Sequence, residues 1–393
     1  MYKILTYNAI SQKGLDRFPN NHYEVSDLCE RPEGIILRSH KLHDVSIPHS
    51  LLAVARAGAG VNNIPVNEYT DYGIVIFNTP GANANAVKEL VVGALMLASR
   101  NIFGGMNYVQ QLSHIENISD MNKLLEREKK RFSGVEIGGK TLGVVGLGAI
   151  GSMIANLALD LGMRVVGYDP AISVESAWQL SSSVERMDSL ELLLSRSDFV
   201  TLHLPAVAET KGLVNSDLLS KMKRTAKILN FAREEVVCED SILAALDKGE
   251  LAGYVTDFPS PQLLGREDVL LMPHIGASTA EAEENCAVMA ANQLIDFLEN
   301  GNIVNSVNFP STKLPRRGGN RITFSNENVP KVLGNVLGVL ADRGLNIIDM
   351  VNKSREAIAY NIVDVEGRLD TELSKEIGLV GGVKRVKILS PVA

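Results

Sequence analysis

Cysteine is scarce in this chain, and the few cysteines that occur are widely separated. Cys29, Cys238 and Cys286 are far apart among 393 residues and match no spacing of a zinc site or a dithiol redox motif. Isolated thiols of this kind are typical of proteins from a reducing cytosol. We therefore expect no structural disulfide and no bound metal.

Long hydrophobic runs and an excess of positive charge are also missing. No apolar stretch approaches the roughly 20 residues that a membrane-spanning helix needs. A strand-like segment begins at Tyr2, so we expect no signal peptide. The net charge is −7, which argues against nucleic acid as a partner but is compatible with a local basic pocket for a small anion. These absences favour a cytoplasmic protein that binds neither membranes nor nucleic acid.

Glycine, by contrast, is concentrated at one informative place. A strand-like apolar segment leads into the sequence Gly146-Leu147-Gly148-Ala149-Ile150-Gly151, and a helical pattern follows over 152–161. The first glycine permits a tight turn, the second lets the backbone approach a pyrophosphate, and the third lets the helix pack against the strand. The phosphates would then lie at the positive N-terminus of the helix. The pattern predicts a dinucleotide site that includes Gly146, Gly148, Ala149, Ile150 and Gly151.

An acidic residue follows this turn at the spacing that such sites require. The next strand-like segment, 164–168, ends at Asp169, eighteen residues after Gly151. A carboxylate at this place accepts hydrogen bonds from both hydroxyls of the adenine ribose and repels a 2′-phosphate. Asp169 therefore predicts NAD, and not NADP, as the cofactor.

Strands and helices alternate along most of the chain. Buried parallel strands are predicted at 3–6, 34–37, 52–55 and 74–77 before the glycine turn and at 198–204, 226–230, 252–257 and 269–272 after it. Helical periodicity predicts helices at 84–99 and 279–300, and an exposed helix and loop at 112–133. This alternation is typical of a doubly wound α/β domain, which we place at 99–279.

The last part of the chain follows a different order. After a linker near 310–320, the pattern predicts strand, helix, strand, strand, helix and strand, at 321–324, 332–343, 346–353, 357–365, 371–377 and 383–389. This order is typical of a ferredoxin-like α+β domain, which we place at 319–393.

Three polar residues follow predicted strands of the α/β domain, where open sheets of this type bind ligands. Arg233 could hold a keto acid through paired hydrogen bonds, or could cap a helix. Asp257 could bind the nicotinamide amide, or simply end its strand. His274 could exchange a proton with a substrate hydroxyl, although an isolated histidine is more often structural.

The whole set of motifs resembles the D-2-hydroxyacid dehydrogenase family from about Ile35 to Asn308. Its elements are the glycine turn, Leu202-His203-Leu204-Pro205 with Thr210, Asn230-x-Ala232-Arg233, Asp257, and Pro273-His274-Ile275-Gly276-Ala277-Ser278-Thr279. The resemblance implies a Rossmann-type NAD-binding domain at 99–279 and a discontinuous, flavodoxin-like substrate domain at 1–98 plus 280–312. It also implies an active site in the cleft between these domains and a ferredoxin-like tail of the ACT regulatory type.

The same resemblance implies roles for individual residues. Arg233 would orient the substrate and His274 would be the general acid and base. The further contacts of NAD would be Leu204, Pro205, Thr210, Phe231, Ala232, Arg233, Asp257, His274, Gly276 and Ala277.

A second group of residues is expected to bind the substrate. The resemblance implies that the backbone of Ala57 and Gly58 holds the substrate carboxylate and that Arg38 and Arg56 face a phosphate. Fixed guanidinium groups suit a dianionic phosphate, so a phosphorylated 2-hydroxy acid is the expected substrate. Surface salt bridges are the alternative role of both arginines.

Two other functions are compatible with the same motifs. One is the same chemistry on an unphosphorylated acid such as glycerate, glyoxylate or lactate. The other is a non-catalytic scaffold that senses NAD.

The sequence departs from the family at one catalytic position. The family has a glutamate twenty-nine residues after the arginine, and that count leads from Arg233 to Gln262. A glutamine can orient an imidazole by accepting its N–H, but it adds no negative charge. Glu267 is the alternative partner of His274.

The tail resembles serine-binding ACT domains in part. Asn328 and Asn346 stand where such domains bind an L-serine effector, whereas Lys331 replaces a glycine and Asn326 replaces a histidine. The alternative role of this domain is dimerisation, and we expect a homodimer or homotetramer.

Overall fold

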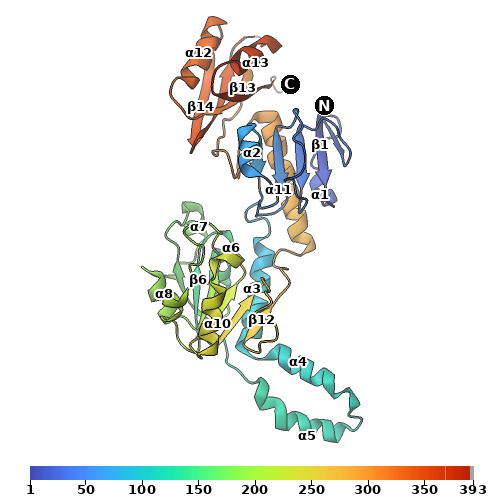
Figure 1. Ribbon diagram of the computed structural model, residues 1–393, viewed down its shortest axis with the longest axis vertical. Coiled ribbons are helices and arrows are strands. Elements are labelled where there is room, and N and C mark those ends of the chain that lie inside the picture. Colours follow the sequence, from blue (N-terminus) through green and yellow to red (C-terminus); the bar gives the residue numbers. More distant parts are fainter. Residues whose placement is uncertain (368, 390–393) are drawn as a thin grey trace. The chain divides into compact units, whose positions relative to one another are not determined.

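The computed structural model in Figure 1 describes residues 1–367 and 369–389, so residue 368 and the last four residues of the predicted segment 319–393 lie outside the described residues. The described residues form one five-stranded, one seven-stranded and one four-stranded sheet, which confirms the predicted mixture of α/β and α+β architecture. They fall into two compact units, 1–83 with 280–393, and 84–279. None of the helices in the described part of the chain has both the length and the apolar composition needed to cross a bilayer.

The unit 84–279 is built on a parallel sheet. In spatial order its strands are β12 (Val269–Leu271), β11 (Gly253–Thr256), β10 (Lys227–Asn230), β9 (Phe199–Leu202), β6 (Thr141–Val145), β7 (Arg164–Tyr168) and β8 (Glu185–Arg186). The inner strands β6, β9, β10 and β11 are almost entirely buried, which explains why they read as continuous apolar runs.

Helices cover both faces of this sheet, and each face has its own hydrophobic core. Helices α3 (Ala84–Ser99) and α6 (Ala149–Asp160) pack on one face. Helices α8 (Leu190–Arg196), α9 (Ser216–Leu219) and α10 (Glu239–Asp247) pack on the other. The unit is therefore doubly wound, as predicted. The short helix α7 (Val174–Gln179) lies beside α6.

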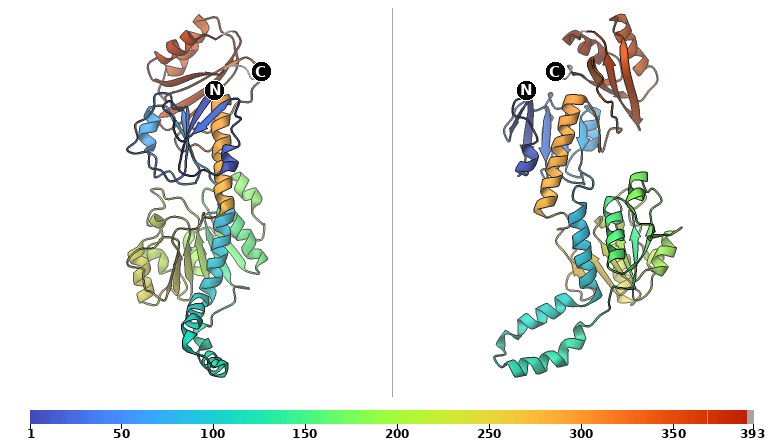
Figure 2. Two further views of the ribbon diagram at one scale, coloured as in Figure 1. Left: turned by 90° about the vertical axis from the view of Figure 1, so that its right-hand side faces the viewer. Right: turned by 180° about the vertical axis from the view of Figure 1, so that it is seen from behind.

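A helical hairpin extends away from this sheet (Figure 2). It contains α4 (Ile102–Gln110) and α5 (Ile118–Glu128), with 3₁₀ turns at Gln111–His114 and Lys129–Phe132. The exposed helix α5 matches the prediction for 112–133, but α4 was not predicted. All residues of α4 are described and none is buried, although Ile102, Met106 and Val109 are apolar and have helical spacing. Its two adjacent glycines lower its helix propensity.

The five-stranded sheet of the other unit is parallel, in the order β2 (Tyr23–Ser26), β1 (Tyr2–Tyr7), β3 (Gly34–Leu37), β4 (Ala53–Arg56) and β5 (Val75–Phe77). The long helix α11 (Ala280–Asn300) and α1 (Gln12–Leu15) pack on one face, and α2 (Val66–Asp71) lies on the other. Strand β2 was not predicted because its four residues include a single buried side chain.

The four-stranded sheet is antiparallel and has the predicted ferredoxin-like order of elements. Its spatial order is β14 (Ile347–Arg355), β15 (Ile358–Val365), β13 (Asn320–Glu327) and β16 (Val383–Leu389). Helices α12 (Val332–Asp342) and α13 (Thr371–Gly378) cover one face. Both this sheet and the five-stranded sheet belong to the first unit, and the three-domain division of the sequence stays a prediction.

The face of the four-stranded sheet that lacks helices packs on the end of α11. Ile358, Tyr360 and Ile362 join the hydrophobic core that includes Phe297 and Phe309. Donors of the four-stranded sheet also bind the last carbonyls of α11 and the residue after it. The distances are 2.6 Å from Lys387 to Leu298 O, 2.9 Å from Arg321 to Asn300 O and 2.8 Å from Tyr360 to Gly301 O.

The guanidinium of Arg321 stabilises α11 at this place because it faces the negative end of the helix dipole. Arg321 is itself fully buried and forms two hydrogen bonds with the carboxylate of Asp364, at 2.6 and 2.7 Å. The buried charge is therefore paired and hydrogen-bonded, as a buried charge must be.

Lys387 makes the stability of this packing depend on pH. Its ammonium group lies 4.6 Å from the ring centre of Tyr2, and burial lowers the pKa of Lys387 to about 7, although Glu33 and Glu299 oppose this shift. An unfolded lysine has a pKa of about 10.4, so between these values the unfolded chain binds one more proton than the folded chain. The free energy of unfolding should therefore rise with pH in this window, by at most about 1.4 kcal/mol per pH unit.

We predict that Lys387→Met reduces this rise, whereas the exposed Lys353→Met does not. Urea unfolding of both variants and the wild type at several pH values between about 7.5 and 9.5 measures the slopes. Equal slopes for Lys387→Met and the wild type would contradict the prediction.

Candidate functional site

The predicted cofactor and catalytic segments of the unit 84–279 lie along one edge of its sheet. Because the strands are parallel, their carboxyl ends share this edge. In spatial order the segments are His274 after β12, Asp257 after β11, Arg233 after β10, Leu204 after β9, Gly146 after β6 and Asp169 after β7. The connections of β6 and β9 leave in opposite directions, and open α/β sheets bind ligands at such a point.

The glycine turn joins β6 directly to α6. Helix α6 begins at Ala149, with Gly148 as its N-cap, three residues earlier than predicted. The hydroxyl of Ser152 donates to Gly148 O at 2.8 Å, which holds the first turn. The unpaired N–H groups of this first turn are thereby presented at the end of β6, where an anion such as a pyrophosphate would bind.

The three glycines are required for three different reasons. Gly146 has a φ of +88°, and a Cβ there would lie 2.5 Å from His203 O. A Cβ on Gly151 would overlap the carbonyl oxygen of Gly146. No described atom lies within 4 Å of the Cβ position of Gly148, so this residue faces open space. That open space above a helix N-terminus fits a dinucleotide.

Asp169 lies beside the glycine turn. Its carboxylate accepts hydrogen bonds from the backbone N–H of Leu147 at 2.8 Å and of Ala171 at 2.9 Å. These two bonds fix the carboxylate at the end of β7, where an adenine ribose would lie.

The segment after β9 is closed by Thr210. Its hydroxyl donates to Pro205 O at 2.5 Å and accepts from the N–H of Val207 at 3.0 Å.

At the start of the same segment, burial lowers the pKa of His203 to about 3, so its imidazole is neutral at pH 7. The ring of His203 hydrogen-bonds Thr201 at 2.8 Å. His203 is therefore structural, unlike the exposed His274.

The loop that carries Arg233 is held by Asn230, a fully buried residue at the end of β10. Its amide donates to Arg233 O at 2.9 Å, and its oxygen accepts from the N–H of Ala232 at 3.1 Å. The sequence motif included Asn230, but its positioning role was not predicted. Phe231 and Ala232 are buried, whereas Arg233 is partly exposed.

Asp257 holds the histidine loop. Its buried carboxylate accepts hydrogen bonds from the N–H of Ile275 at 2.9 Å and of Gly276 at 2.7 Å. His274 has a φ of +57°, an uncommon conformation for a residue with a side chain. The two bonds from Asp257 support this conformation, so Asp257 does more than end its strand.

The structure shows Phe258, and not a carboxylate, against the ring of His274. The two rings are 5.0 Å apart and nearly perpendicular. Gln262 and Glu267 are both exposed in the loop between β11 and β12. A role for either residue as the partner of His274 stays a prediction.

In the other unit, the predicted substrate residues lie at the carboxyl edge of the five-stranded sheet. Arg38 follows β3 and Arg56 ends β4, its direct neighbour. The Nε of Arg56 donates to Arg38 O at 2.9 Å, and Arg38 forms an ion pair with Glu283 of α11 at 2.7 Å. The structure therefore brings the two arginines together. It adds Glu283, which the sequence did not mark because it lies far away in the chain.

The backbone donors of Ala57 and Gly58 are engaged within the chain. Ala57 N–H donates to Leu37 O at 2.8 Å, and Gly58 N–H donates to Arg56 O at 2.9 Å. A substrate carboxylate would therefore have to share these two N–H groups with the carbonyl oxygens, or replace the carbonyl oxygens as their acceptor.

The two predicted effector residues lie at opposite ends of β15. Asn328 bonds the backbone of Glu356 before this strand, and Asn346 bonds the side chain of Glu366 after it. Strand β15 is eight residues long, or about 25 Å, so both asparagines of one chain cannot contact the same small molecule. Lys331, which stands where the family usually has a glycine, has a left-handed conformation with a φ of +77°, and glycine adopts this conformation most readily.

We predict that Gly148→Ala weakens dinucleotide binding by about tenfold or more while the fold is retained, because a methyl group would enter the open space above α6. Gly93→Ala in α3 is the matched control, since its Cβ also meets no described atom within 4 Å. Fluorescence titration with NADH measures both affinities. Equal affinity of Gly148→Ala and the wild type would show that no pyrophosphate approaches this glycine.

Comparison with known proteins agrees with this geometry. A sequence model described as D-isomer specific 2-hydroxyacid dehydrogenase, NAD binding domain, matches residues 93–276. These residues contain the glycine turn, Asp169, Arg233 and His274. The chain therefore has an NAD-binding domain, and NAD is its cofactor, as predicted.

Curated relatives match most of the chain. The D-3-phosphoglycerate dehydrogenase of Haemophilus influenzae is 32% identical over 372 residues, which cover 91% of this chain and 86% of that protein. The enzyme of the same name from Synechocystis sp. is 35% identical over 329 residues, which cover 79% of this chain. This chain spans 56% of the length of the Synechocystis enzyme.

A solved structure shows the same similarity. The NAD⁺-bound 3-phosphoglycerate dehydrogenase of Entamoeba histolytica matches with a TM-score of 0.61 and 26% identity, over 78% of this chain and 98% of that one. The motifs, the fold and these relatives lead to one conclusion: the chain belongs to the D-isomer-specific 2-hydroxyacid dehydrogenase family.

Proposed function

We propose that this chain oxidises 3-phospho-D-glycerate to 3-phosphohydroxypyruvate with NAD, the first step of the phosphorylated route to L-serine. The observation that carries the proposal is that Arg38 and Arg56 lie together at one sheet edge. The Nε of Arg56 donates a hydrogen bond to the backbone oxygen of Arg38 at 2.9 Å. Relatives named D-3-phosphoglycerate dehydrogenase support it.

The site residues would divide the chemistry between them. Arg233 would bind the α-carboxylate and the C2 oxygen, because a guanidinium can donate two parallel hydrogen bonds and stays charged. His274 would accept the proton of the C2 hydroxyl while the hydride leaves C2. NAD, when bound, supplies the hydride acceptor. In the reverse direction the protonated His274 would return its proton to the C2 oxygen.

Arg38 and Arg56 would bind the phosphate of the substrate. In the structure Glu283 neutralises Arg38 at 2.7 Å, with both side chains exposed by about two fifths. A phosphate carries more negative charge than a carboxylate and offers three acceptor oxygens, so it can replace this partner. Because both side chains are partly exposed, displacement of Glu283 would leave no buried charge without a partner.

We expect that Arg56→Gln raises the KM for phosphohydroxypyruvate by about ten- to a hundredfold, since charged hydrogen bonds contribute about 1.5–3 kcal/mol each. The KM for hydroxypyruvate, which has no phosphate, should change little. Arg31→Gln, which removes an exposed arginine elsewhere in this unit, is the control. Steady-state NADH consumption gives both constants, and equal effects on both substrates would place the phosphate elsewhere.

Two other functions remain to be separated from this one. A reductase for an unphosphorylated hydroxy acid would turn over glyoxylate or hydroxypyruvate faster than phosphohydroxypyruvate. A scaffold that only senses NAD would turn over neither acid, and Arg233→Ala would then have no turnover to abolish.

Gln262 is proposed to orient His274 without adding charge. Gln262→Glu should then shift the acidic limb of the pH–rate profile for alcohol oxidation to higher pH, because a nearby carboxylate favours the charged imidazolium. Glu267→Gln is the matched variant for the alternative partner and should leave the profile unchanged. A shift with Glu267→Gln alone would assign the role to Glu267.

For the four-stranded domain we propose binding of L-serine at a site shared by two chains, with Asn328 and Asn346 from different copies. We predict that serine lowers the turnover of the wild type and that Asn346→Ala weakens this inhibition. A flat response over a wide range of serine concentrations would leave dimerisation as the role of this domain.

The assembly is proposed to be a homodimer or homotetramer. The α4–α5 hairpin exposes Phe103, Met106, Val109 and Ile118. Apolar side chains gathered on one projecting hairpin fit a second copy of the chain.

We place the protein in the cytoplasm because its thiols are isolated and free.

A further inference from the structure

The ion pair between Arg38 and Glu283 joins two segments that lie far apart in the sequence. Arg38 follows β3, and Glu283 lies in the first turn of α11. The Nη1 of Arg38 is 2.7 Å from a carboxylate oxygen of Glu283, and both side chains are partly exposed. An exposed pair of this kind adds little to the stability of a fold. Its place next to Arg56 suits a role in the binding of a ligand.

Both arginines lie near this turn of α11. The Nε of Arg56 donates to the backbone oxygen of Arg38 at 2.9 Å, so Arg56 is held against the residue that Glu283 pairs with. Cys286, one helical turn after Glu283, is 5% exposed. Burial raises the pKa of its thiol, and the positive charges of Arg38 and Arg56 oppose that rise. Two guanidinium groups and one carboxylate therefore share a small region.

A phosphate bound by these arginines would meet the carboxylate of Glu283. If the carboxylate leaves Arg38, the ion pair must break before the phosphate binds. If the carboxylate stays, two negatively charged groups lie side by side and repel each other. In both cases the phosphate binds less tightly than it would to the same arginines without Glu283.

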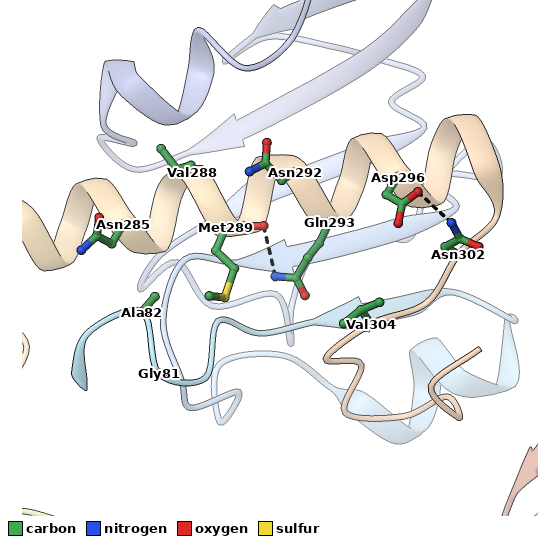
Figure 3. Close-up of a pocket in the computed structure, with 10 residues that line it drawn as sticks. All are labelled: Gly81, Ala82, Asn285, Val288, Met289, Asn292, Gln293, Asp296, Asn302 and Val304. Carbon is green, nitrogen blue, oxygen red and sulfur yellow. Dashed lines mark hydrogen bonds between the residues drawn. The ribbon is translucent and has the colours of Figure 1, made fainter. Parts of the chain in front are cut away.

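The next turns of α11 offer no such contact to an anion. Figure 3 shows the groove that runs along the helix from Asn285 to Asp296. Among the described residues that line this groove, Asp296 is the one with a charged side chain, and it is acidic. This groove should therefore repel a phosphate ion, so a titration with phosphate does not report on it.

We propose that Glu283 is a specificity-determining residue that competes with the substrate phosphate for Arg38. This role rests on the proposed function, in which Arg38 and Arg56 bind that phosphate. The competition lowers the affinity for every ligand that carries a phosphate. A phosphorylated hydroxy acid has further contacts through its carboxylate and still binds, whereas inorganic phosphate lacks them and is kept from occupying the site.

Calorimetric titration of the full chain with inorganic phosphate, in a buffer without other multivalent anions, tests this competition. Glu283→Gln removes the charge but keeps an oxygen that can accept a hydrogen bond from Arg38. We expect this variant to bind phosphate about three- to tenfold more tightly than the wild type, because a competing partner and a repelling charge are both lost. Glu281→Gln is the matched control, since it removes the other acidic residue from the first turn of α11 and should leave the affinity unchanged.

Two further measurements assign the effect to Arg38. Steady-state NADH consumption by Glu283→Gln should show a KM for phosphohydroxypyruvate that is lower by a similar factor, while the KM for hydroxypyruvate stays nearly the same. When Arg38→Gln is combined with Glu283→Gln, the gain in phosphate affinity should disappear, because the cation for which the two anions compete is gone.

Several results would overturn the competition. They are phosphate binding by Glu283→Gln that is undetectable, equal to that of the wild type or weaker, an equal gain in Glu281→Gln, and a gain that persists without Arg38. Weaker binding would show that Glu283 holds Arg38 in position for the phosphate. The titration involves no turnover, so these results would leave the dehydrogenase function in place, whereas equal turnover of the two acids by the wild type would contradict the proposed substrate.

Discussion

The close contact between Gly151 and the carbonyl of Gly146 is the constraint on which the rest of the cofactor unit depends. Any side chain on Gly151 would overlap that carbonyl oxygen, so the contact requires glycine. It fixes the start of α6 directly behind β6 and leaves the space above Gly148 open. Asp169 then bonds the N–H of Leu147 within the same turn. One steric requirement therefore sets both the helix end that is predicted to bind the pyrophosphate and the carboxylate that is predicted to bind the ribose.

The parallel sheet brings the candidate catalytic residues to the same edge as the glycine turn. Parallel strands place all their carboxyl ends on one edge, and Arg233 and His274 follow strands β10 and β12 at that edge. Each loop is then fixed by a buried polar side chain. Asn230 holds the arginine loop through two hydrogen bonds, and Asp257 holds the histidine loop through two more. Arg233 is partly exposed and His274 is exposed, while the residues that hold their loops are buried.

Local patterns allowed most of the fold to be predicted, because the strands are apolar runs and the glycine turn has a defined spacing. Features that depend on distant contacts could not be predicted. Glu283 meets Arg38 only because α11 packs on the first sheet. Helix α4 was missed for a local reason, since its two adjacent glycines lower its helix propensity. Asn328 and Asn346 occupy suitable positions in sequence, yet strand β15 separates them within one chain. The roles of the site residues, Gln262 above all, rest on the resemblance and stay predictions.

The central claim is that the substrate carries a phosphate, which Arg38 and Arg56 bind. The most direct test is the ratio of kcat/KM for phosphohydroxypyruvate to that for hydroxypyruvate, measured with NADH and the wild-type chain. Two charged hydrogen bonds of about 1.5–3 kcal/mol each predict a ratio of at least about a hundred in favour of the phosphorylated acid. A ratio near one, or a preference for hydroxypyruvate, would contradict the account.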